Sequence, residues 1–251
     1  MRVVACIPAR WGSSRLPGKP LAEIGGKSMV QRTYEQVAKC SGIDDIVIAT
    51  DDDRVQLAAQ EFGANSMMTS PDHASGTDRV LEVCESLGLD QHDLIINVQG
   101  DEPFVNPSHI QSLIQAMQEN PTYEMGTVAL EWRGTIQSLS DPNVVKVVRG
   151  AQGKALYFSR ALIPYPRDLG PDDPHTVLRH LGLYAFRFHF LRAFSSLPES
   201  ALEDQEKLEQ LRVLEAGHNI YLRVVEGQFH SGIDTPEQLA YADQYARQGL
   251  L

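Results

Sequence analysis

Apolar runs alternate with amphipathic segments through the first half of the chain. Four runs lack the polar alternation of a half-exposed strand and predict parallel strands covered on both faces, the third of them weaker: Val3–Ile7, Ile46–Ala49, Met67–Met68 and Leu94–Val98. Apolar residues at helical spacing behind capping residues predict four helices: from Ser28, from Asp51, over Asp78–Leu87, and from Asn106-Pro107 to about Glu119. This alternation predicts an α/β fold with a mostly parallel, doubly wound, Rossmann-like sheet and right-handed crossovers.

The pattern changes after Met125, where strands follow one another without helices between them. Strands are predicted over Thr127–Trp132, Val144–Val148, Ala155–Ser159, Leu181–Phe188 and Ile220–Val225. A charged amphipathic helix is predicted over Glu203–Ala216, a closing helix over Pro236–Arg247, and a mobile surface loop over the proline-, glycine- and aspartate-rich stretch Ile163–Val177. We therefore expect one domain over residues 1–251 with an inserted α+β subregion.

The charge balance excludes a general affinity for nucleic acid. The chain carries 22 Lys and Arg against 33 Asp and Glu, a net charge of −11, whereas proteins that bind a nucleic-acid backbone present a basic patch. Residues 1–32 are the exception, because six cations there face the single acid Glu23. An acidic protein with a basic start suits a small anionic ligand whose remaining charge is neutralised by a divalent metal.

The apolar runs, the start of the chain and the cysteines indicate the cellular location. No apolar run approaches the ~20 residues that a membrane-spanning helix needs, and no signal-peptide pattern precedes the first strand. Cys6, Cys40 and Cys84 are odd in number and lack metal-ligand spacing, which is typical of a reducing compartment. The sequence therefore predicts a cytoplasmic protein that does not insert into membranes.

The stretch after the first strand concentrates candidate chemistry. Arg10, Arg15 and Lys19 lie among glycines and serines, so fixed cations and backbone N–H groups can converge on a polyanion. Ligands of open α/β sheets bind beyond the carboxyl ends of strands, which favours a phosphate-binding loop over a merely solvated one. A Walker A loop is excluded because Leu21 stands where glycine is required, and Gly-x-Gly-x-x-Gly does not follow the strand.

Two aspartates are candidates for a magnesium site. Asp101 directly follows the strand Leu94–Val98, at the sheet edge expected to carry the cationic loop, and Asp234 precedes the last helix. Mg²⁺ takes oxygen ligands, typically one or two carboxylates plus phosphate oxygens. A turn role for Asp101 is the alternative, while a capping box of Thr235 and Gln238 explains the helix start but leaves Asp234 unexplained.

The segment HASGTDR has two interpretations. Its hydroxyl groups and the exposed N–H groups of a helix start favour an anion or a base carbonyl. Alternatively, Thr77 is the helix cap and Arg79 a solvated residue of the first turn.

The second half of the chain also offers candidates with plain structural alternatives. Arg160 can hold a carboxylate, and His180 and Tyr184 can bind hydroxyl groups, or the three are a surface cation and two core residues. Glu209 and Gln210 are solvated unless their helix closes over a ligand. Neither a hydrolase triad motif nor a zinc pattern is present in the sequence.

Nine motifs that span nearly the whole chain occur in an order characteristic of one enzyme family. They are IPARWGSSRLPGKPL, ATDDDR, HASGTDR, NVQGDEP, NVVKVV, ALYFSRALIPYPRD, RHLGLYAFR, LEQLRVLEAGH and GIDTPEQL. This set resembles the sugar-activating nucleotidyltransferases, and among them the cytidylyltransferases that load 3-deoxy-manno-octulosonate (Kdo) onto CMP. It is less similar to relatives that activate sialic acid or hexose phosphates.

The resemblance implies a role for each matched residue. The CTP phosphates would be bound by Arg10, Ser13, Arg15 and Lys19, and the nucleotide would be surrounded by Ser75, Arg79 and Gln99. Magnesium would be bound by Asp101 and Asp234, which act in catalysis with Arg15 and Lys19. The sugar acid would be held by Arg160, His180, Tyr184, Glu209 and Gln210. Residues 1–124 would mainly bind nucleotide, 125–225 would mainly bind sugar and form a homodimer, and 226–251 would return to the metal site.

The implied reaction transfers CMP from CTP to the anomeric hydroxyl of Kdo, giving CMP-Kdo and pyrophosphate for lipopolysaccharide biosynthesis. It needs positioning and charge stabilisation rather than a protein nucleophile. An 8-amino form of Kdo or another sugar acid is an alternative substrate. A non-catalytic nucleotide-sensing module is the alternative from another class, and an NAD-dependent oxidoreductase would require the glycine-rich turn that the sequence lacks.

Overall fold

The computed structural model describes residues 1–248, and the chain divides into two compact units. Unit 1 comprises Met1–Gln111, Arg187–His189 and the chain from Gly227 onward. Unit 2 comprises Ser112–Phe186 and Phe190–Glu226. The functional division into residues 1–124, 125–225 and 226–251 stays a prediction, since a unit boundary says nothing about what each part binds.

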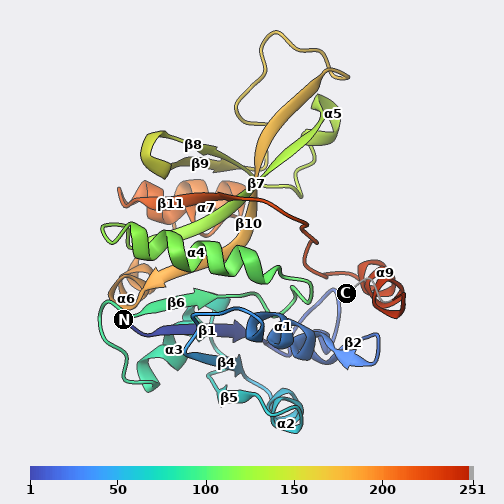
Figure 1. The fold of residues 1–251 in the computed structure, drawn as a ribbon, viewed down its shortest axis with the longest axis vertical. Helices are drawn as coiled ribbons and strands as arrows, with labels where there is room; N and C mark the ends of the chain where they lie inside the picture. The colour runs from blue at the N-terminus through green and yellow to red at the C-terminus, as the bar shows by residue number, and fades with distance from the viewer. Residues whose placement is uncertain (249–251) are drawn as a thin grey trace. The chain divides into compact units, whose positions relative to one another are not determined.

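The sheet of unit 1 is built from the parallel strands that the sequence predicts. Its order is β6 (Leu94–Asn97), β1 (Val3–Pro8), β4 (Asp45–Thr50) and β5 (Asn65–Met68), which lie side by side in Figure 1. Successive strands are connected through α1 (Met29–Ala38), α2 (Asp53–Glu61) and α3 (Gly76–Ser86). Every residue of β1 is buried, as a strand covered on both faces requires. The predicted α/β class with a mostly parallel sheet is confirmed.

Helix starts in unit 1 use the capping chemistry expected from the sequence. The hydroxyl of Ser28 accepts the N–H of Gln31 at the start of α1. Thr235 and Gln238 form the predicted capping box of α9 (Pro236–Arg247), and α4 (Pro107–Glu119) begins at the predicted proline. Each such cap stabilises its helix by about 1 kcal/mol, so these starts are locally encoded.

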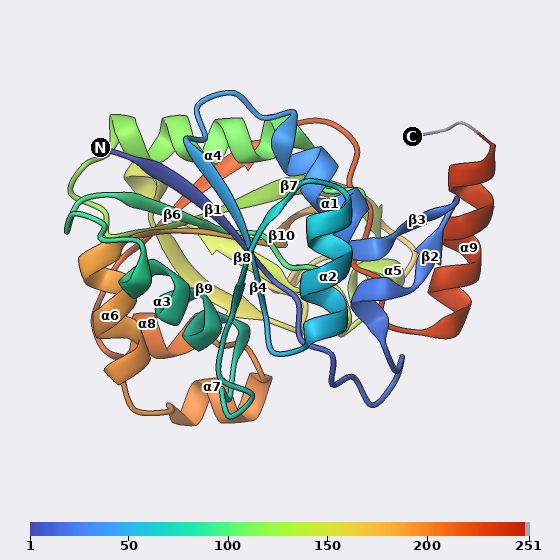
Figure 2. The ribbon, with the colours of Figure 1, turned by 90° about the horizontal axis from the view of Figure 1, so that it is seen from below.

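A two-stranded hairpin in unit 1 was not predicted. β2 (Glu23–Ile24) and β3 (Lys27–Ser28) are too short for a periodic signal, and Figure 2 shows them beside α9. The N–H of Gly25 donates to Asp243 Oδ1 at 2.7 Å. A small apolar cluster lies beneath the hairpin and contains Leu16, Ile24, Met29, Ile233 and Ala242. This cluster ties the loop after β1 to the segment that carries Asp234.

Unit 2 has a mainly antiparallel sheet. β10 (Pro174–Arg187) pairs with β7 (Met125–Thr135) and β8 (Lys146–Arg149), and β9 (Ala155–Ser159) extends the sheet beyond β8. β11 (Ile220–Val225) pairs with β7 in parallel. The other elements are α5 (Ile136–Leu139), η2 (Ala151–Gly153), α7 (Ala201–Glu206), α8 (Leu211–Glu215) and α6 (Phe188–Ser196), whose first two residues belong to unit 1.

Three sequence expectations in this half are wrong in detail. The predicted helix over Glu203–Ala216 is two helices, because Lys207 adopts a left-handed conformation with φ of 52°. The predicted loop ends at residue 173 rather than at Val177, since β10 already begins at Pro174. The predicted strand Leu181–Phe188 ends at Arg187, and α6 was missed. Each error depends on partners distant in sequence, such as the pairing of Pro174 with Thr135.

Lys146 is the least expected core residue of unit 2. Its side chain is fully buried, and its Nζ donates hydrogen bonds to the carbonyl oxygens of Asp141, Val144 and Arg160. Burial is the main cause that lowers the pKa of this ammonium group. Three acceptors match the three N–H donors of an ammonium group, so Lys146 connects the segment before β8 to the end of β9.

Candidate active site

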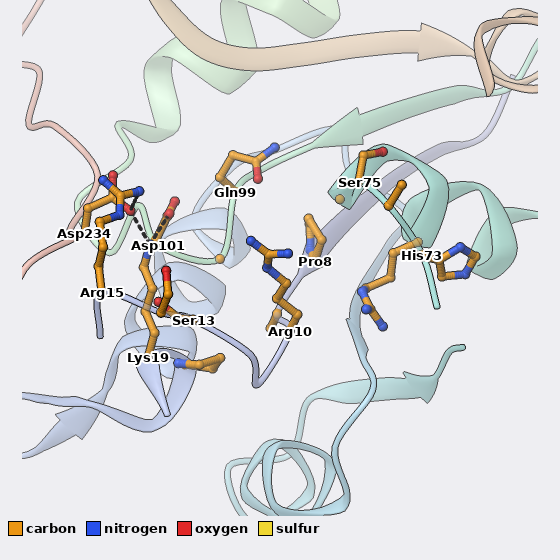
Figure 3. A pocket seen from close by; sticks show the side chains of 17 residues that line it. Pro8, Arg10, Ser13, Arg15, Lys19, His73, Ser75, Gln99, Asp101 and Asp234 are labelled. Atoms are coloured by element: carbon orange, nitrogen blue, oxygen red, sulfur yellow. Dashed lines mark hydrogen bonds and ion pairs between the residues drawn. The ribbon is translucent and has the colours of Figure 1, made fainter. Parts of the chain in front are cut away.

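A cavity of about 420 Å³ lies in unit 1, beyond the carboxyl ends of β1 and β6. Its volume falls within the ~300–1,000 Å³ that is usual for small-molecule sites. All nine residues predicted to bind nucleotide or metal line it: Arg10, Ser13, Arg15, Lys19, Ser75, Arg79, Gln99, Asp101 and Asp234. Figure 3 shows the two aspartates with Arg15 and Lys19 at one end and Ser75 at the other. The chain therefore brings together side chains that are more than 200 residues apart in sequence.

The loop between β1 and η1 (Lys19–Leu21) forms the cationic wall. Ser13 Oγ accepts the N–H of Leu16 at 3.2 Å, and the buried Leu16 side chain belongs to the apolar cluster below. Gly18 has φ of +67°, and an added Cβ would lie 3.0 Å from the indole of Trp11. The left-handed backbone conformation favours glycine here, and a side chain would also have to displace the Trp11 ring by a few tenths of an ångström. The loop is thus folded back on itself immediately before Lys19.

Lys19 lies between the two candidate metal ligands. Its Nζ donates to Asp101 Oδ2 and, at 2.9 Å, to Asp234 Oδ1. Arg15 Nη2 donates to the same Asp234 oxygen at 3.0 Å. The N–H of Ile233 donates to the backbone oxygen of Asp101 at 2.9 Å, which fixes the two segments against each other. Two carboxylates therefore converge on one cation, an arrangement of hard oxygen donors that fits a divalent metal ion.

The carboxyl group of Glu102, next to Asp101 in sequence, has a raised pKa. Burial and, secondarily, the charge of Asp101 raise the pKa of Glu102 to about 8. Burial therefore favours the protonated form of Glu102, since a neutral carboxyl avoids the desolvation of a charge.

The loop after β6 passes very close to β1. A Cβ added to Gly100 would lie 2.6 Å from the carbonyl oxygen of Pro8, so the motif NVQGDEP requires glycine there. The preceding Gln99 donates from Nε2 to Asn97 Oδ1 at 3.4 Å. Asn97 is fully buried, and its Nδ2 has no hydrogen-bond partner among residues 1–248.

The start of α3 forms the other end of the cavity. Ser75, not Thr77, is the cap, and it forms a capping box with Asp78. Arg79 is not solvated, because its side chain is only 3% exposed. Its Nη2 donates to Asp51 Oδ2 at 2.9 Å, and its Nη1 donates to the hydroxyl of Thr69. The interpretation of Arg79 as a solvated first-turn residue is therefore wrong.

Sequence reasoning assigned no functional role to Asp51 or Trp11, which contact each other and, through Asp51, the cavity residue Arg79. Asp51 Oδ1 accepts the backbone N–H of Trp11 at 2.9 Å while its other oxygen pairs with Arg79. The Trp11 ring lies 3.5 Å from the guanidinium carbon of Arg54. The motif ATDDDR contains Asp51, but its three successive aspartates do not indicate which one turns inward.

The five residues predicted for the sugar acid all belong to unit 2. Arg160 donates to the backbone oxygens of Glu206 at 2.7 Å, Pro142 at 2.9 Å and Lys207 at 3.4 Å. Its own N–H and the hydroxyl of Ser159 are both bound by the Glu206 carboxylate. Arg160 thus connects three chain segments, which the sequence did not indicate.

His180 and Tyr184 are neighbours on β10, with ring centroids 5.4 Å apart. A register shift between Leu181 and Tyr184 allows the Thr127 hydroxyl to donate to Leu183 O at 2.8 Å and to accept from His180 Nε2 at 2.9 Å. Burial lowers the pKa of His180 to about 3, so this imidazole is neutral at physiological pH.

Glu209 and Gln210 precede α8 rather than lying within a long helix. Gln210 is only 4% exposed, and its Nε2 has no hydrogen-bond partner among the described residues. The expectation that this pair is solvated is therefore wrong for Gln210. Their predicted role toward a sugar acid stays a prediction.

Comparison with known proteins identifies the family. The family model for cytidylyltransferases matches residues 4–220. The chain belongs to the cytidylyltransferase family. It is therefore a nucleotidyltransferase, and the resemblance inferred from the nine motifs is confirmed.

Individual relatives of this cytidylyltransferase are similar over their whole length. A 3-deoxy-manno-octulosonate cytidylyltransferase of Syntrophotalea carbinolica is 49% identical, with 98% of this chain and 99% of the relative covered. An 8-amino-3,8-dideoxy-manno-octulosonate cytidylyltransferase of Shewanella baltica is 46% identical, with 97% and 98% covered. A solved CMP:2-keto-3-deoxy-manno-octonic acid synthetase complexed with CTP superposes with a TM-score of 0.91 at 42% identity, covering 99% of this chain and all of that one.

One finding bears on membrane association. None of the helices within residues 1–248 of this cytidylyltransferase is both long and apolar enough to cross a bilayer.

Proposed function

We propose that the protein transfers CMP from CTP to the anomeric hydroxyl of Kdo, giving CMP-Kdo and pyrophosphate for lipopolysaccharide biosynthesis. The observation that carries this proposal is the convergence of Asp101 and Asp234 on Lys19 beside a cationic loop, in one cavity of nucleotide size. The relatives named above support the choice of CTP and of an octulosonate as the two substrates.

Different residues of the cavity are proposed to bind different parts of the nucleotide. Arg10 is exposed, lines the cavity and has no ion pair or hydrogen bond with any other residue of 1–248, so its guanidinium is available to phosphate oxygens. Arg15 and Lys19 add two further cations where negative charge develops on the reacting phosphates. Ser13, Ser75, Arg79 and Gln99 are proposed to complete the walls around the nucleotide.

Asp101 and Asp234 are proposed to hold Mg²⁺. When bound, the ion neutralises phosphate charge and lowers the pKa of an attacking hydroxyl. The two carboxylates supply the oxygen donors that this ion prefers, and their segments are joined through the Ile233–Asp101 backbone hydrogen bond. With the carboxylates engaged by the ion, Lys19 would be available to phosphate oxygens.

The sugar acid is proposed to bind residues of unit 2. The buried amide nitrogen of Gln210 has no hydrogen-bond partner within residues 1–248, and Tyr184 adds a phenol next to His180. Arg160, His180 and Glu209 remain candidates from the family resemblance, although Arg160 and His180 already bind protein groups. The Shewanella relatives favour a second candidate substrate, the 8-amino form of Kdo.

The experiment that tests this function is pyrophosphate release by the purified protein with CTP and Mg²⁺. Kdo, 8-amino-Kdo, sialic acid or no sugar is added in parallel reactions. Release that requires both CTP and Kdo supports the proposal, and release with the amino sugar alone keeps the reaction but changes the substrate. CTP binding without release for any sugar contradicts it and favours the nucleotide-sensing alternative.

Two further properties are proposed with this function. The free thiols of Cys6, Cys40 and Cys84 support a cytoplasmic location. The homodimer is proposed from the family resemblance. Light scattering coupled to size-exclusion chromatography tests the dimer, because a monomer mass of 27.8 kDa would contradict it.

A further inference from the structure

We propose that Asp51 is a positioning residue that holds the phosphate-binding loop and the start of α3 in register with each other. It does not line the cavity, but each of its carboxylate oxygens binds one of the two walls. The inference rests on the proposed function for the identity of the nucleotide, while the contacts themselves are independent of it.

The first oxygen fixes the start of the phosphate-binding loop. Asp51 Oδ1 accepts the N–H of Trp11 at 2.9 Å, and the preceding Thr50 donates from its hydroxyl to Ala9 O at 2.7 Å. The backbone on both sides of Arg10 is therefore bound to the end of β4. The backbone around Arg10 is thus ordered before a ligand binds, so binding costs mainly the rotamer entropy of its exposed side chain.

Trp11, which Asp51 holds, also contacts the end of the same loop. The Trp11 indole lies against Gly18, where an added Cβ would be 3.0 Å from the ring, and Gly18 directly precedes Lys19. Arg54 covers the Trp11 ring with its guanidinium carbon 3.5 Å from the ring centroid. A shift of the Trp11 backbone would therefore move the residue next to Lys19 as well as Arg10.

The second oxygen fixes the opposite wall. Asp51 Oδ2 accepts from Arg79 Nη2 at 2.9 Å, and the side chains of Asp51 and Arg79 are only 14% and 3% exposed. Arg79 also donates to Thr69, whose hydroxyl donates to Thr50 O at 3.0 Å. A buried ion pair with few alternative partners restricts the geometry, so the Asp51 carboxylate links the two walls alongside the hydrogen bonds that run from Arg79 through Thr69 to Thr50.

Asp51 is the aspartate of the motif ATDDDR that contacts both walls, and the other two have different roles. Asp52 caps α2 and pairs with Arg54, and Asp53 is exposed at the first position of that helix. Asp53→Asn is therefore a matched control, because it removes the same charge two residues away without touching either wall.

The test uses two measurements on the full chain, in a Trp132→Phe background so that Trp11 is the only tryptophan. The first is the dissociation constant for CTP by isothermal titration. The second is acrylamide quenching of Trp11 fluorescence, which reports the exposure of the loop and would not change through a loss of global stability alone. Both are made well below the melting temperature of each variant.

Asp51→Ala loses both contacts, so CTP must order the two walls when it binds, and we expect its affinity to fall by ~10- to 100-fold. Quenching of Trp11 should rise in the same variant. Asp51→Asn keeps an acceptor for the Trp11 N–H but loses the charge that pairs with Arg79. It should therefore show quenching near that of the Asp53→Asn control and an intermediate loss of CTP affinity.

Two results would overturn the proposal. One is CTP affinity in Asp51→Ala equal to that of the Asp53→Asn control. The other is lost affinity with unchanged Trp11 quenching. If Asp51→Ala does not fold, Asp51→Asn decides, since wild-type CTP affinity in that variant contradicts the link to Arg79. Neither measurement includes the sugar, so failure of the proposed transfer reaction would be seen separately, as absent pyrophosphate release by the wild-type protein.

Discussion

The two units use their arginines in different ways. In unit 1, Arg10 and Arg15 are exposed at the cavity, and the only described partner of Arg15 is the candidate metal ligand Asp234. In unit 2, Arg160 donates to three backbone oxygens. All three residues were predicted to bind anionic ligands from the same kind of motif. Arg160 stabilises the fold whether or not it binds a ligand, whereas Arg10 has no stabilising contact within the described chain.

The difference teaches that the surroundings of a cation, rather than its presence in a motif, decide what its removal will do. Loss of an exposed cavity cation such as Arg10 or Arg15 should reduce binding and turnover and leave the stability of the fold nearly unchanged. Loss of a buried or backbone-bound cation in unit 2 should first lower the free energy of unfolding. The following predictions test this contrast, beginning with the largest effect.

Asp101→Asn should lower turnover by ~10³-fold, because a charged ligand for the reacting groups becomes neutral while its size is kept. The fold should persist, since the hydrogen bond from Ile233 reaches the backbone oxygen of Asp101. Steady-state pyrophosphate release and a thermal melt check this, with Asp53→Asn as the matched loss of charge. Turnover near that of the control would contradict the role of Asp101.

Lys19→Met should lower kcat/KM by ~10²-fold, because one cation facing the phosphates is lost. Its stem is similar in length, so packing of the loop should be retained. Kinetics as a function of CTP concentration provide the measurement. A loss of activity that is fully restored by more Mg²⁺ would show that Lys19 only screens Asp101 and Asp234.

His180 should make the stability of the protein sensitive to acid. Its pKa is lowered by burial to about 3, so between about pH 6.5 and pH 3 the unfolded chain binds a proton that the folded chain does not. Stability contributed by neutral His180 is thus fully present above about pH 6.5 and falls as the pH falls. At pH 5, 1.5 pH units below 6.5, the loss should be about 2 kcal/mol, at about 1.36 kcal/mol per unit.

Urea unfolding at pH 7 and pH 5 measures this loss. His180→Gln keeps a donor for Thr127 but cannot titrate, so its change in unfolding free energy between the two pH values should be smaller than that of the wild type by the same amount. Equal pH dependence in both proteins would exclude His180 as the cause.

Arg160→Lys should lower the free energy of unfolding by about 1–2 kcal/mol, because hydrogen bonds from a charged group to backbone oxygens are lost. The exposed Arg167→Lys is the control in the same unit. Chemical denaturation gives the stability, and the KM for Kdo measured on the same variant sharpens the comparison. An unchanged stability with a raised KM would show that Arg160 acts on the ligand alone.

The fold of unit 1 could be predicted almost completely from the sequence, because its signals are local. Buried runs such as Val3–Ile7, capping residues such as Ser28, and Pro107 at a helix start each act within a few residues. The ends of β10 and the break at Lys207 could not be predicted, since they depend on cross-strand pairing and on a buried Glu203–Arg212 pair.

The candidate site shows the same limit. The nine predicted residues that line the cavity follow strand ends or open helices, and the ordered motifs single them out. Asp51 has no local signal, because only the tertiary structure shows which of three aspartates faces Trp11 and Arg79. Sequence patterns also could not predict the burial of Gln210 Nε2 or the three carbonyl partners of Arg160.

The most direct test of the account follows the α-phosphate of CTP. The protein is incubated with Mg²⁺, Kdo and CTP labelled at the α-phosphorus, and the products are separated by chromatography. We predict that the label appears in a nucleotide-sugar product, that unlabelled pyrophosphate is released in equal amount, and that Asp101→Asn forms neither. Label that remains in CTP, or that appears as free CMP without a sugar product, would contradict nucleotidyl transfer at this cavity.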